Sequence, residues 1–250
     1  MLALLSDAST GSAAVSFGGA KLPLKASFPQ PACACVNTVP TPGHILDALA
    51  PMAKKLQFGR GDEIIAQGDP AEYCIQVVSG CVRTVQLLED GRRQVGAFLL
   101  PGDVFGWEAL GEHAFAAEAV TPVTLRRFRL AAIDERADND RTFAQKLRRH
   151  IAEQIRITRG HLTLLGRLTA SERIAAFLLE MSDRLRGPGK STIELPMCRA
   201  DMADYLCLTI ETVSRGLTEL RQSGAIGVER SHIAIHDRRA LSLTGFGRLH

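Results

Sequence analysis

Between residues 58 and 130 the chain is divided into short apolar segments by glycines that recur every eleven or twelve residues. Short strands at such regular spacing, with turn residues between them, are typical of a jelly roll or antiparallel barrel. The sequence therefore predicts a β-roll, in which strands at 74–78 and 82–87 flank a turn and 89–91 forms the next turn. The recurring glycines are Gly68, Gly80, Gly91 and Gly102.

A helical period replaces this rhythm after residue 140. A narrow, largely apolar stripe recurs at steps of three or four over several turns, which predicts one long amphipathic helix. The stripe could pack on the chain's own β domain or against the same helix of a second copy, as in a short coiled coil. We favour the homodimer. The stripe consists of Leu147, Ile151, Ile155, Thr158, Leu162 and Leu165.

The charge of the chain is unevenly distributed. The formal net charge is only +3, and DNA binding requires a basic patch more than a basic total. The segment from Arg141 to Arg167 is rich in basic residues and contains a single acidic one, Glu153. Taken alone, that run indicates a solvated helix face. With 46% hydrophobic and 23% charged residues, the composition is that of a globular protein rather than a disordered or fibrous one.

The C-terminal part predicts a small α+β domain that contains a helix-turn-helix. Helices are expected at 171–185, 199–206 and 209–222, and a hairpin at 226–228 and 233–235. Ala203 is small where the two short helices would cross. The residues expected to pack between those helices are Met202, Leu206, Ile210, Val213 and Leu217.

The second short helix carries side chains suited to DNA. Thr209 can cap it, so that its N-terminus faces phosphate. Arg215 can donate two hydrogen bonds to guanine, and Glu211 can accept one from cytosine. The alternative is a simple Glu211–Arg215 surface pair, four residues apart. We favour a double-stranded DNA contact that also includes Thr212, Ser214 and Arg199.

These motifs resemble the CRP/FNR superfamily of bacterial regulators, and within it the FNR/FixK-type branch. The resemblance runs from about residue 44 to the C-terminus and rests on residues 79–83, 100–106, 172–179 and 210–215. It implies an α+β fold: a cyclic-nucleotide-binding-like β-roll, a long dimerisation helix and a winged helix-turn-helix. The expected boundaries are 1–42 for a flexible extension, 43–136 for the β-roll, 137–165 for the dimerisation helix and 166–250 for the DNA-binding domain.

The same resemblance implies a function. Relatives of this branch form homodimers, bind TTGAT-like inverted repeats and contact RNA polymerase. Glu211, Ser214 and Arg215 match the pattern that contacts those half-sites. We therefore expect a transcription activator of low-oxygen or nitrogen metabolism. The alternative is a direct redox or oxygen sensor, in which an iron-sulfur cluster or small effector switches DNA binding.

The chain departs from the superfamily where cofactors bind. Ala116 and Ala117 stand near the Arg-Ser that holds a cyclic nucleotide, so we do not expect that ligand, and Trp107 is expected to fill part of its pocket. An N-terminal iron-sulfur site would have Cys33 and Cys35 alone. Two further thiols could complete four ligands. These are Cys74 and Cys81, which we expect instead to pack as small hydrophobes. We expect no cofactor.

Two other cysteines frame the first short helix. Cys207 occupies a turn position where glycine is usual in this family. Cys198 precedes the helix, near the expected phosphate backbone, and thiols at helix starts oxidise readily. Oxidation there would oppose DNA, so we expect both cysteines to be candidate redox residues. His232 and His236 are expected to share one face of the hairpin without forming a metal site.

Other function classes find little support. We see no catalytic nucleophile with its base, no phosphate loop and no metal-ligand set, so we do not expect an enzyme. The short apolar stretch Leu2–Leu5 lacks a preceding basic segment, and no later run reaches membrane-spanning length. We therefore expect a cytoplasmic protein with no membrane partner and mostly reduced cysteines.

Overall fold

The structure is a computed structural model that describes residues 45–107, 111–185 and 192–246. The expected N-terminal extension, 1–42, lies outside these residues. The first described element is a 3-10 helix, η1 (Asp47–Met52), and strand β1 begins at Lys54. The apolar spacing of residues 44–56 predicts a short helix, but the helix that forms is shorter and is followed by β1 within the same span. Pro51 lies inside η1 and lacks the N–H that a longer helix needs.

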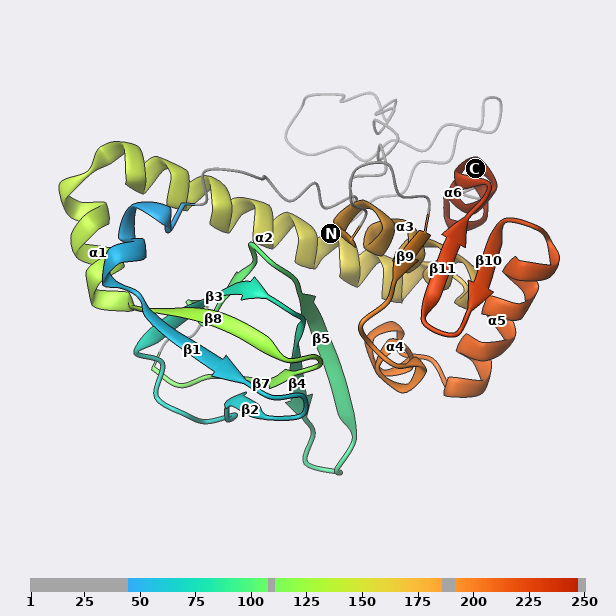
Figure 1. Ribbon diagram of the computed structural model, residues 1–250, viewed down its shortest axis with the longest axis horizontal. Coiled ribbons are helices and arrows are strands. Elements are labelled where there is room, and N and C mark those ends of the chain that lie inside the picture. The colour runs from blue at the N-terminus through green and yellow to red at the C-terminus, as the bar shows by residue number, and fades with distance from the viewer. Residues whose placement is uncertain (1–44, 108–110, 186–191, 247–250) are drawn as a thin grey trace, which may run out of the picture. The chain divides into compact units, whose positions relative to one another are not determined.

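Eight strands form the β-roll as two four-stranded antiparallel sheets, ordered β1-β8-β3-β6 and β2-β7-β4-β5 (Figure 1). Their bounds are β1 (Lys54–Phe58), β2 (Glu63–Ile65), β3 (Tyr73–Ser79), β4 (Val82–Leu87), β5 (Arg93–Leu99), β6 (Val104–Phe105), β7 (Ala116–Ala119) and β8 (Val123–Arg129). The expectation of strands at 74–78 and 82–87 is confirmed.

Strands β3 and β4 are consecutive, yet they belong to different sheets. The chain turns at Gly80, whose φ of +86° is open to glycine at little cost, and passes from one sheet to the other. The following turn, at Gly91, instead closes a true hairpin between β4 and β5. The glycine rhythm thus predicts where strands end, but not which strands pair.

Three hydrophobic clusters hold the described chain together. One lies between the two sheets and includes Val77, Val82 and Leu125. A second packs the other side of β8 against η1 and the following helices. The third joins the β4–β5 hairpin to the C-terminal domain. The β-roll therefore has its own core and also contributes to the core of the domain that follows.

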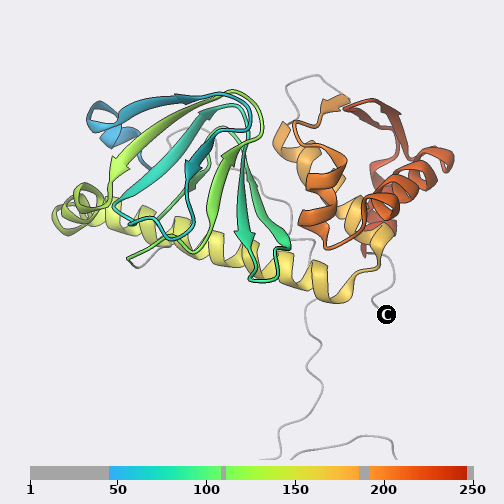
Figure 2. The same cartoon turned by 90° about the horizontal axis from the view of Figure 1, so that it is seen from below.

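Three helices lead out of the β-roll: α1 (Leu130–Asn139), α2 (Arg141–Arg167) and α3 (Ala170–Leu185). Asp140 caps α2 by accepting hydrogen bonds from the backbone N–H groups of Thr142 and Phe143. Figure 2 shows α2 running past the strands and on to the C-terminal helices. Its Phe143 is buried in the cluster beside η1, and its Leu164 in the cluster shared with the C-terminal domain.

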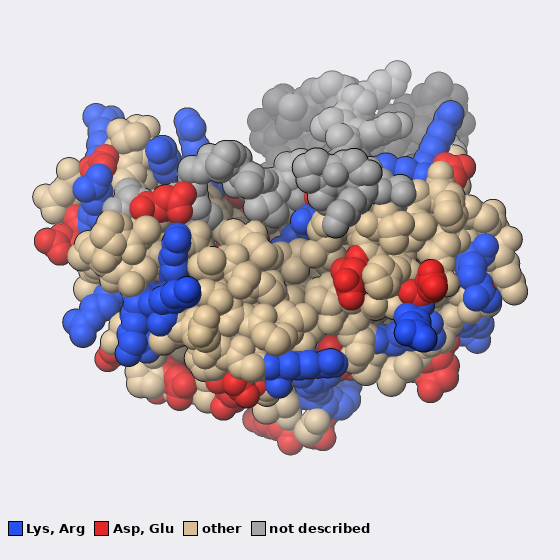
Figure 3. All heavy atoms as spheres, in the orientation of Figure 1, with Lys and Arg blue, Asp and Glu red and all other residues tan. Residues whose placement is uncertain are grey.

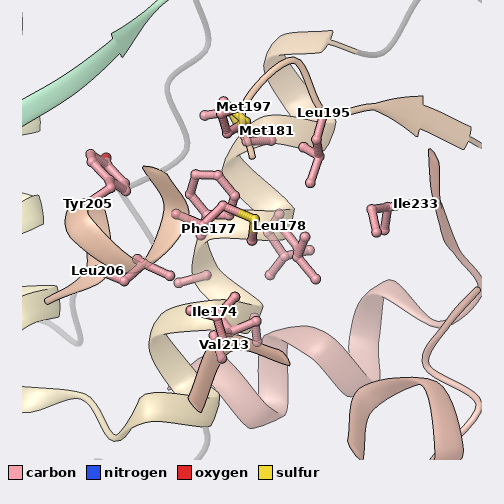
Figure 4. Packing of buried hydrophobic residues seen from close by; sticks show 14 of the residues in the cluster. Ile174, Phe177, Leu178, Met181, Leu195, Met197, Tyr205, Leu206, Val213 and Ile233 are labelled. Atoms are coloured by element: carbon pink, nitrogen blue, oxygen red, sulfur yellow. The ribbon is translucent and has the colours of Figure 1, made fainter. Parts of the chain in front are cut away.

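The C-terminal domain confirms the expected α+β fold class with a helix-turn-helix and wing. Sheet order β10-β11-β9 is antiparallel throughout. Figure 4 shows its core, in which Phe177 and Leu178 of α3 lie among side chains of the other elements. The elements are β9 (Thr192–Glu194), α4 (Arg199–Leu206), α5 (Ile210–Gln222), β10 (Ile226–Glu229), β11 (His232–Ile235) and α6 (Arg238–Phe246).

The two turns offer a matched test of the fold. A Cβ added at Gly80 would lie 2.3 Å from the carbonyl oxygen of Pro122, whereas one at Gly91 would meet nothing within 4 Å. Both glycines have positive φ, so alanine costs about 1 to 2 kcal/mol at either. Gly80→Ala should cost about 1 to 3 kcal/mol more, because of the clash. Urea unfolding of both variants measures the difference, and equal losses would contradict the crossover geometry.

Candidate nucleic-acid interface

Helix α4 and the turn after it form as the sequence suggests. The helix ends where Cys207 adopts a left-handed conformation, with φ of 53°. The N–H groups of Cys207 and Leu208 both donate to the carbonyl of Ala203. A left-handed residue at a helix end is usually glycine, because a Cβ is strained there. Glycine would avoid this strain, whereas Cys207 adopts the left-handed conformation with a Cβ.

The packing of α4 against α5 confirms four of the five expected core residues. Met202, Leu206, Val213 and Leu217 are buried, as is Ala203. Ile210 was also expected to pack there, and that expectation is wrong because its side chain is 47% exposed. As the first residue of α5, Ile210 lies one turn before Val213 and beyond the reach of α4's buried face.

Sequence reasoning missed the close approach of α5 to α3. Gly216 is buried, and a Cβ there would lie 2.5 Å from Cδ1 of Ile174. The small residue that lets the recognition helix sit on the domain core is therefore Gly216, in addition to Ala203. A glycine inside an otherwise regular helical pattern was the available signal, since such a residue usually has a packing reason.

The N-terminus of α5 is capped and charged. The hydroxyl oxygen of Thr209 accepts a hydrogen bond of 3.2 Å from the backbone N–H of Thr212. The carboxylate of Glu211 is fully exposed, and hydrogen bonds from its own backbone N–H and from the Thr209 hydroxyl lower its pKa. Glu211 is therefore a carboxylate at neutral pH, which makes it a pure hydrogen-bond acceptor.

One face of α5 presents the residues predicted to contact DNA. Glu211 and Arg215 are exposed, and Ser214 is half-buried between them. The guanidinium of Arg199, at the start of α4, lies 3.3 Å from the hydroxyl of Ser214. Among the described residues, Glu211 and Arg215 form no ion pair with each other. Neither side chain is therefore neutralised by the other.

The wing carries a further exposed cation. Arg230 is exposed at the turn between β10 and β11 and has a φ of 56°. The sequence analysis did not select it, although its position between two short strands marks a hairpin tip. On the face drawn in Figure 3, basic and acidic side chains are interspersed.

The two histidines of the wing do not come together around a metal. His232 Nε2 lies 3.8 Å from Glu194 Oε2, across the sheet. The ring of His236 instead covers Gly227, where an added Cβ would lie 2.8 Å from Nε2. Over the described ranges there is no group of three His, Cys, Asp or Glu side chains that could hold a metal ion.

An open pocket of about 400 Å³ lies between Trp107 and α2. Trp107 lines it, and its ring centroid is 4.7 Å from that of His150. Ala116 and Ala117 are buried in β7. Alanine offers no charge for a phosphate at those positions. The pocket is lined by Trp107, Ile151, Gln154, Ile155, Thr158 and Arg159.

The cysteines fall into separate environments. Cys74 is buried beside η1, whereas Cys81 is buried in the cluster shared with the C-terminal domain. Burial raises the pKa of the Cys81 thiol to about 12, which keeps it protonated. Cys198 and Cys207 are exposed free thiols on either side of α4. Cys33 and Cys35 lie outside the described residues.

Helix α2 leaves part of its apolar stripe uncovered. Ile151, Ile155 and Leu162 are 43%, 48% and 64% exposed. Three large aliphatic side chains on one helix stripe are typical of a contact surface. Over the part of the chain that is described, no helix is long and apolar enough to cross a membrane.

Comparison with known proteins identifies both domains. Residues 55–140 match the family model of the cyclic nucleotide-binding domain, and residues 172–243 match that of the Crp-like helix-turn-helix domain. The chain is 45% identical over 183 residues to the nitrogen fixation regulation protein FixK of Rhizobium meliloti, covering 73% of this chain and 79% of the relative. FixK of Azorhizobium caulinodans is 41% identical, with coverage of 80% and 81%.

A solved structure gives the same result. FixK2 from Bradyrhizobium japonicum aligns with a TM-score of 0.72 at 44% identity, covering 76% of this chain and 95% of that structure. The two domain models, the sequence identities and the shared fold all agree. The chain therefore belongs to the FNR/FixK branch of the CRP/FNR family and is a DNA-binding transcription regulator.

Proposed function

We propose that the protein is a cytoplasmic homodimer that activates transcription from a TTGAT-like inverted repeat, in the control of low-oxygen or nitrogen metabolism. The observation that carries the proposal is the exposed face of α5, where Glu211, Ser214 and Arg215 lie side by side with Arg199 close to Ser214. The similarity to the nitrogen fixation regulation protein FixK of Rhizobium meliloti supports the proposed role in nitrogen metabolism.

Each residue of that face has a proposed role. Arg215 donates to guanine, Glu211 accepts from cytosine, and Ser214 contacts either base. Thr209 and Thr212 bring the N-terminus of α5 to phosphate, and Arg199 contacts phosphate from the start of α4. These side chains bind and do not catalyse, so we propose no enzymatic activity. In a dimer the two helices enter successive major grooves about 34 Å apart, and RNA polymerase is the partner beside them.

A second candidate is a direct sensor of the same fold. The pocket beside Trp107 favours a small apolar effector over a cyclic nucleotide, because its lining is mostly uncharged. A brown chromophore in anaerobically purified protein would instead indicate an iron-sulfur cluster. Either sensor would require a ligand for selective DNA binding, whereas an effector-independent regulator would not.

Arg215→Ala tests the reading of the operator. The variant should bind a TTGAT-N4-ATCAA duplex about 1 to 3 kcal/mol more weakly than wild type, because a bidentate contact is lost. Its discrimination between bases at one base pair should also decrease. Fluorescence anisotropy of reduced protein at fixed salt measures both, with a scrambled duplex for comparison. Arg221→Ala, in the last turn of the same helix, is the matched control. A uniform loss over all sequences would make Arg215 a phosphate contact.

Ile155→Asp tests the homodimer. A carboxylate in the middle of the exposed stripe would be buried against its own copy, so the variant should elute as a monomer and lose most of its affinity for the inverted repeat. Light scattering after size exclusion gives the mass. Leu243→Asp, on an exposed leucine of α6, should remain dimeric. A dimeric Ile155→Asp protein would contradict the use of this face.

Oxidation of Cys198 should weaken operator binding. Hydrogen peroxide converts a thiolate to sulfenic acid, and further oxidation adds negative charge beside the DNA backbone. Cys198→Ser should bind normally and resist peroxide, and Cys207→Ser separates the second exposed thiol from the first. Mass spectrometry would establish the oxidation state before each titration. Undiminished affinity of protein shown to be oxidised at Cys198 would refute this role.

A further inference from the structure

The β4–β5 hairpin holds α4 through a set of buried charges. Asp201 of α4 is only 3% exposed. Its Oδ1 lies 2.5 Å from Nη1 of Arg83 in β4 and 3.0 Å from Nη2 of Arg93 in β5. Arg83 also binds Glu118 of β7, with Nε 2.8 Å from Oε2. A buried carboxylate of the DNA-binding domain therefore pairs with two guanidinium groups of the β-roll.

The next turn of α4 is held by the same hairpin. Arg93 donates to Oδ2 of Asp204 from Nε at 3.0 Å and from Nη2 at 2.7 Å. Gln94 donates 2.6 Å to the carbonyl oxygen of Asp204 and accepts 3.3 Å from the thiol of Cys207. That carbonyl belongs to the last turn of α4, where backbone carbonyl groups have no hydrogen-bond donor within the helix. The hairpin thus caps the end of α4 and fixes two of its carboxylates.

An apolar contact accompanies the charges. Phe98 of β5 lies 5.2 Å from the ring centroid of Tyr205 and 6.2 Å from that of Phe177. Beside it, Arg184 of α3 pairs with Asp103 and donates 3.1 Å to the carbonyl of Phe98. Burial of aromatic surface supplies the stabilisation here, and it is non-directional.

The charged contacts fix the orientation of α4, which the apolar contacts do not. Replacing buried ion pairs by apolar residues is often neutral for stability. Hydrogen bonds from two guanidinium groups to two carboxylates of one helix, in contrast, permit only a narrow range of helix angles. Arg83 and Arg93 bind carboxylates one turn apart on the eight-residue helix α4, and Gln94 binds the backbone carbonyl of Asp204 in the same helix. They therefore restrain the angle of α4, and α5 turns with it because Met202 and Leu206 pack against Val213.

We propose that Arg83, Arg93 and Gln94 are positioning residues that set which operator spacing the dimer accepts. The proposal rests on the proposed function, binding of an inverted repeat by a homodimer. Adding one base pair between half-sites moves them about 3.4 Å apart and rotates them by about 34°. A dimer whose recognition helices are held at one angle cannot follow that change, whereas one with loosened helices can.

Arg93→Ala is the test, and Arg92→Ala is its matched control. Arg92 is the neighbouring residue and removes the same charge, but its side chain is 77% exposed and pairs with Asp90 inside the hairpin. Affinities are measured by anisotropy for TTGAT repeats separated by three, four and five base pairs, and for a single half-site. Urea unfolding of each variant is followed separately, and Gln94→Ala serves if Arg93→Ala does not fold.

The expected result is a loss of spacing preference without a loss of base reading. Wild type and Arg92→Ala should prefer one spacing by on the order of tenfold. Arg93→Ala should bind the three spacings within about threefold of one another, with single-half-site affinity unchanged. Asp204→Ala should shift the profile in the same direction but less, because Arg93 keeps its contact with Asp201. The double variant should add little to Arg93→Ala, which already breaks the Arg93–Asp204 contact.

Two results would overturn the proposal while leaving the proposed function intact. One is an Arg93→Ala protein that keeps the wild-type spacing profile and loses only stability or overall affinity. The other is a wild-type protein that selects the repeat without any spacing preference. A wild-type protein with no selectivity for the repeat would defeat the proposed function, and the positioning role with it.

Discussion

The contact between the β4–β5 hairpin and the C-terminal helices is the constraint on which the rest of the structure depends. Phe98, Val85 and Val95 of the hairpin belong to the same buried cluster as Phe177 and the other residues of the helix-turn-helix core. A domain this small buries little apolar surface by itself. By sharing its core with the β-roll, the DNA-binding domain gains stability and a defined neighbour in the same step.

The position of the recognition helix α5 depends on how closely it approaches α3. Gly216 lets α5 lie against Ile174 of α3, and Thr209 starts the helix at the point where its first turn is free of the core. As a result the buried residues of α5 all face inward while Glu211 and Arg215 face outward. The binding face is thus a consequence of how the helix must be seated, not an independent feature.

The sequence predicts local structure well and long-range pairing poorly. The turn at Gly80 and the α4 bounds at Arg199 and Leu206 follow from residue types and periodicity. The placement of β3 and β4 in separate sheets does not, because register depends on which surfaces meet. Ile210 looked like a core residue because periodicity cannot say where a partner helix ends.

The candidate site shows the same division. Glu211, Ser214 and Arg215 could be chosen from one helix and its face. The partners of Asp201 could not be chosen, because Arg83 and Arg93 precede it by 118 and 108 residues. A charged residue in an amphipathic segment is ordinarily assigned to solvent. Only the fold shows that Asp201 is buried and pairs with Arg83 and Arg93.

That burial connects two features that seem unrelated in the sequence. The thiol of Cys198 lies 3.3 Å from Oδ2 of Asp201, whose other oxygen accepts from Arg83 and Arg93. Asp201 therefore has two guanidinium groups and one thiol as neighbours, and it shares the guanidinium groups with Glu118 and Asp204. A negative group in place of that thiol would stand beside a buried carboxylate and compete for the same guanidinium groups. Chemistry at the edge of the DNA interface would then act on the contact that orients α4, as well as on DNA directly.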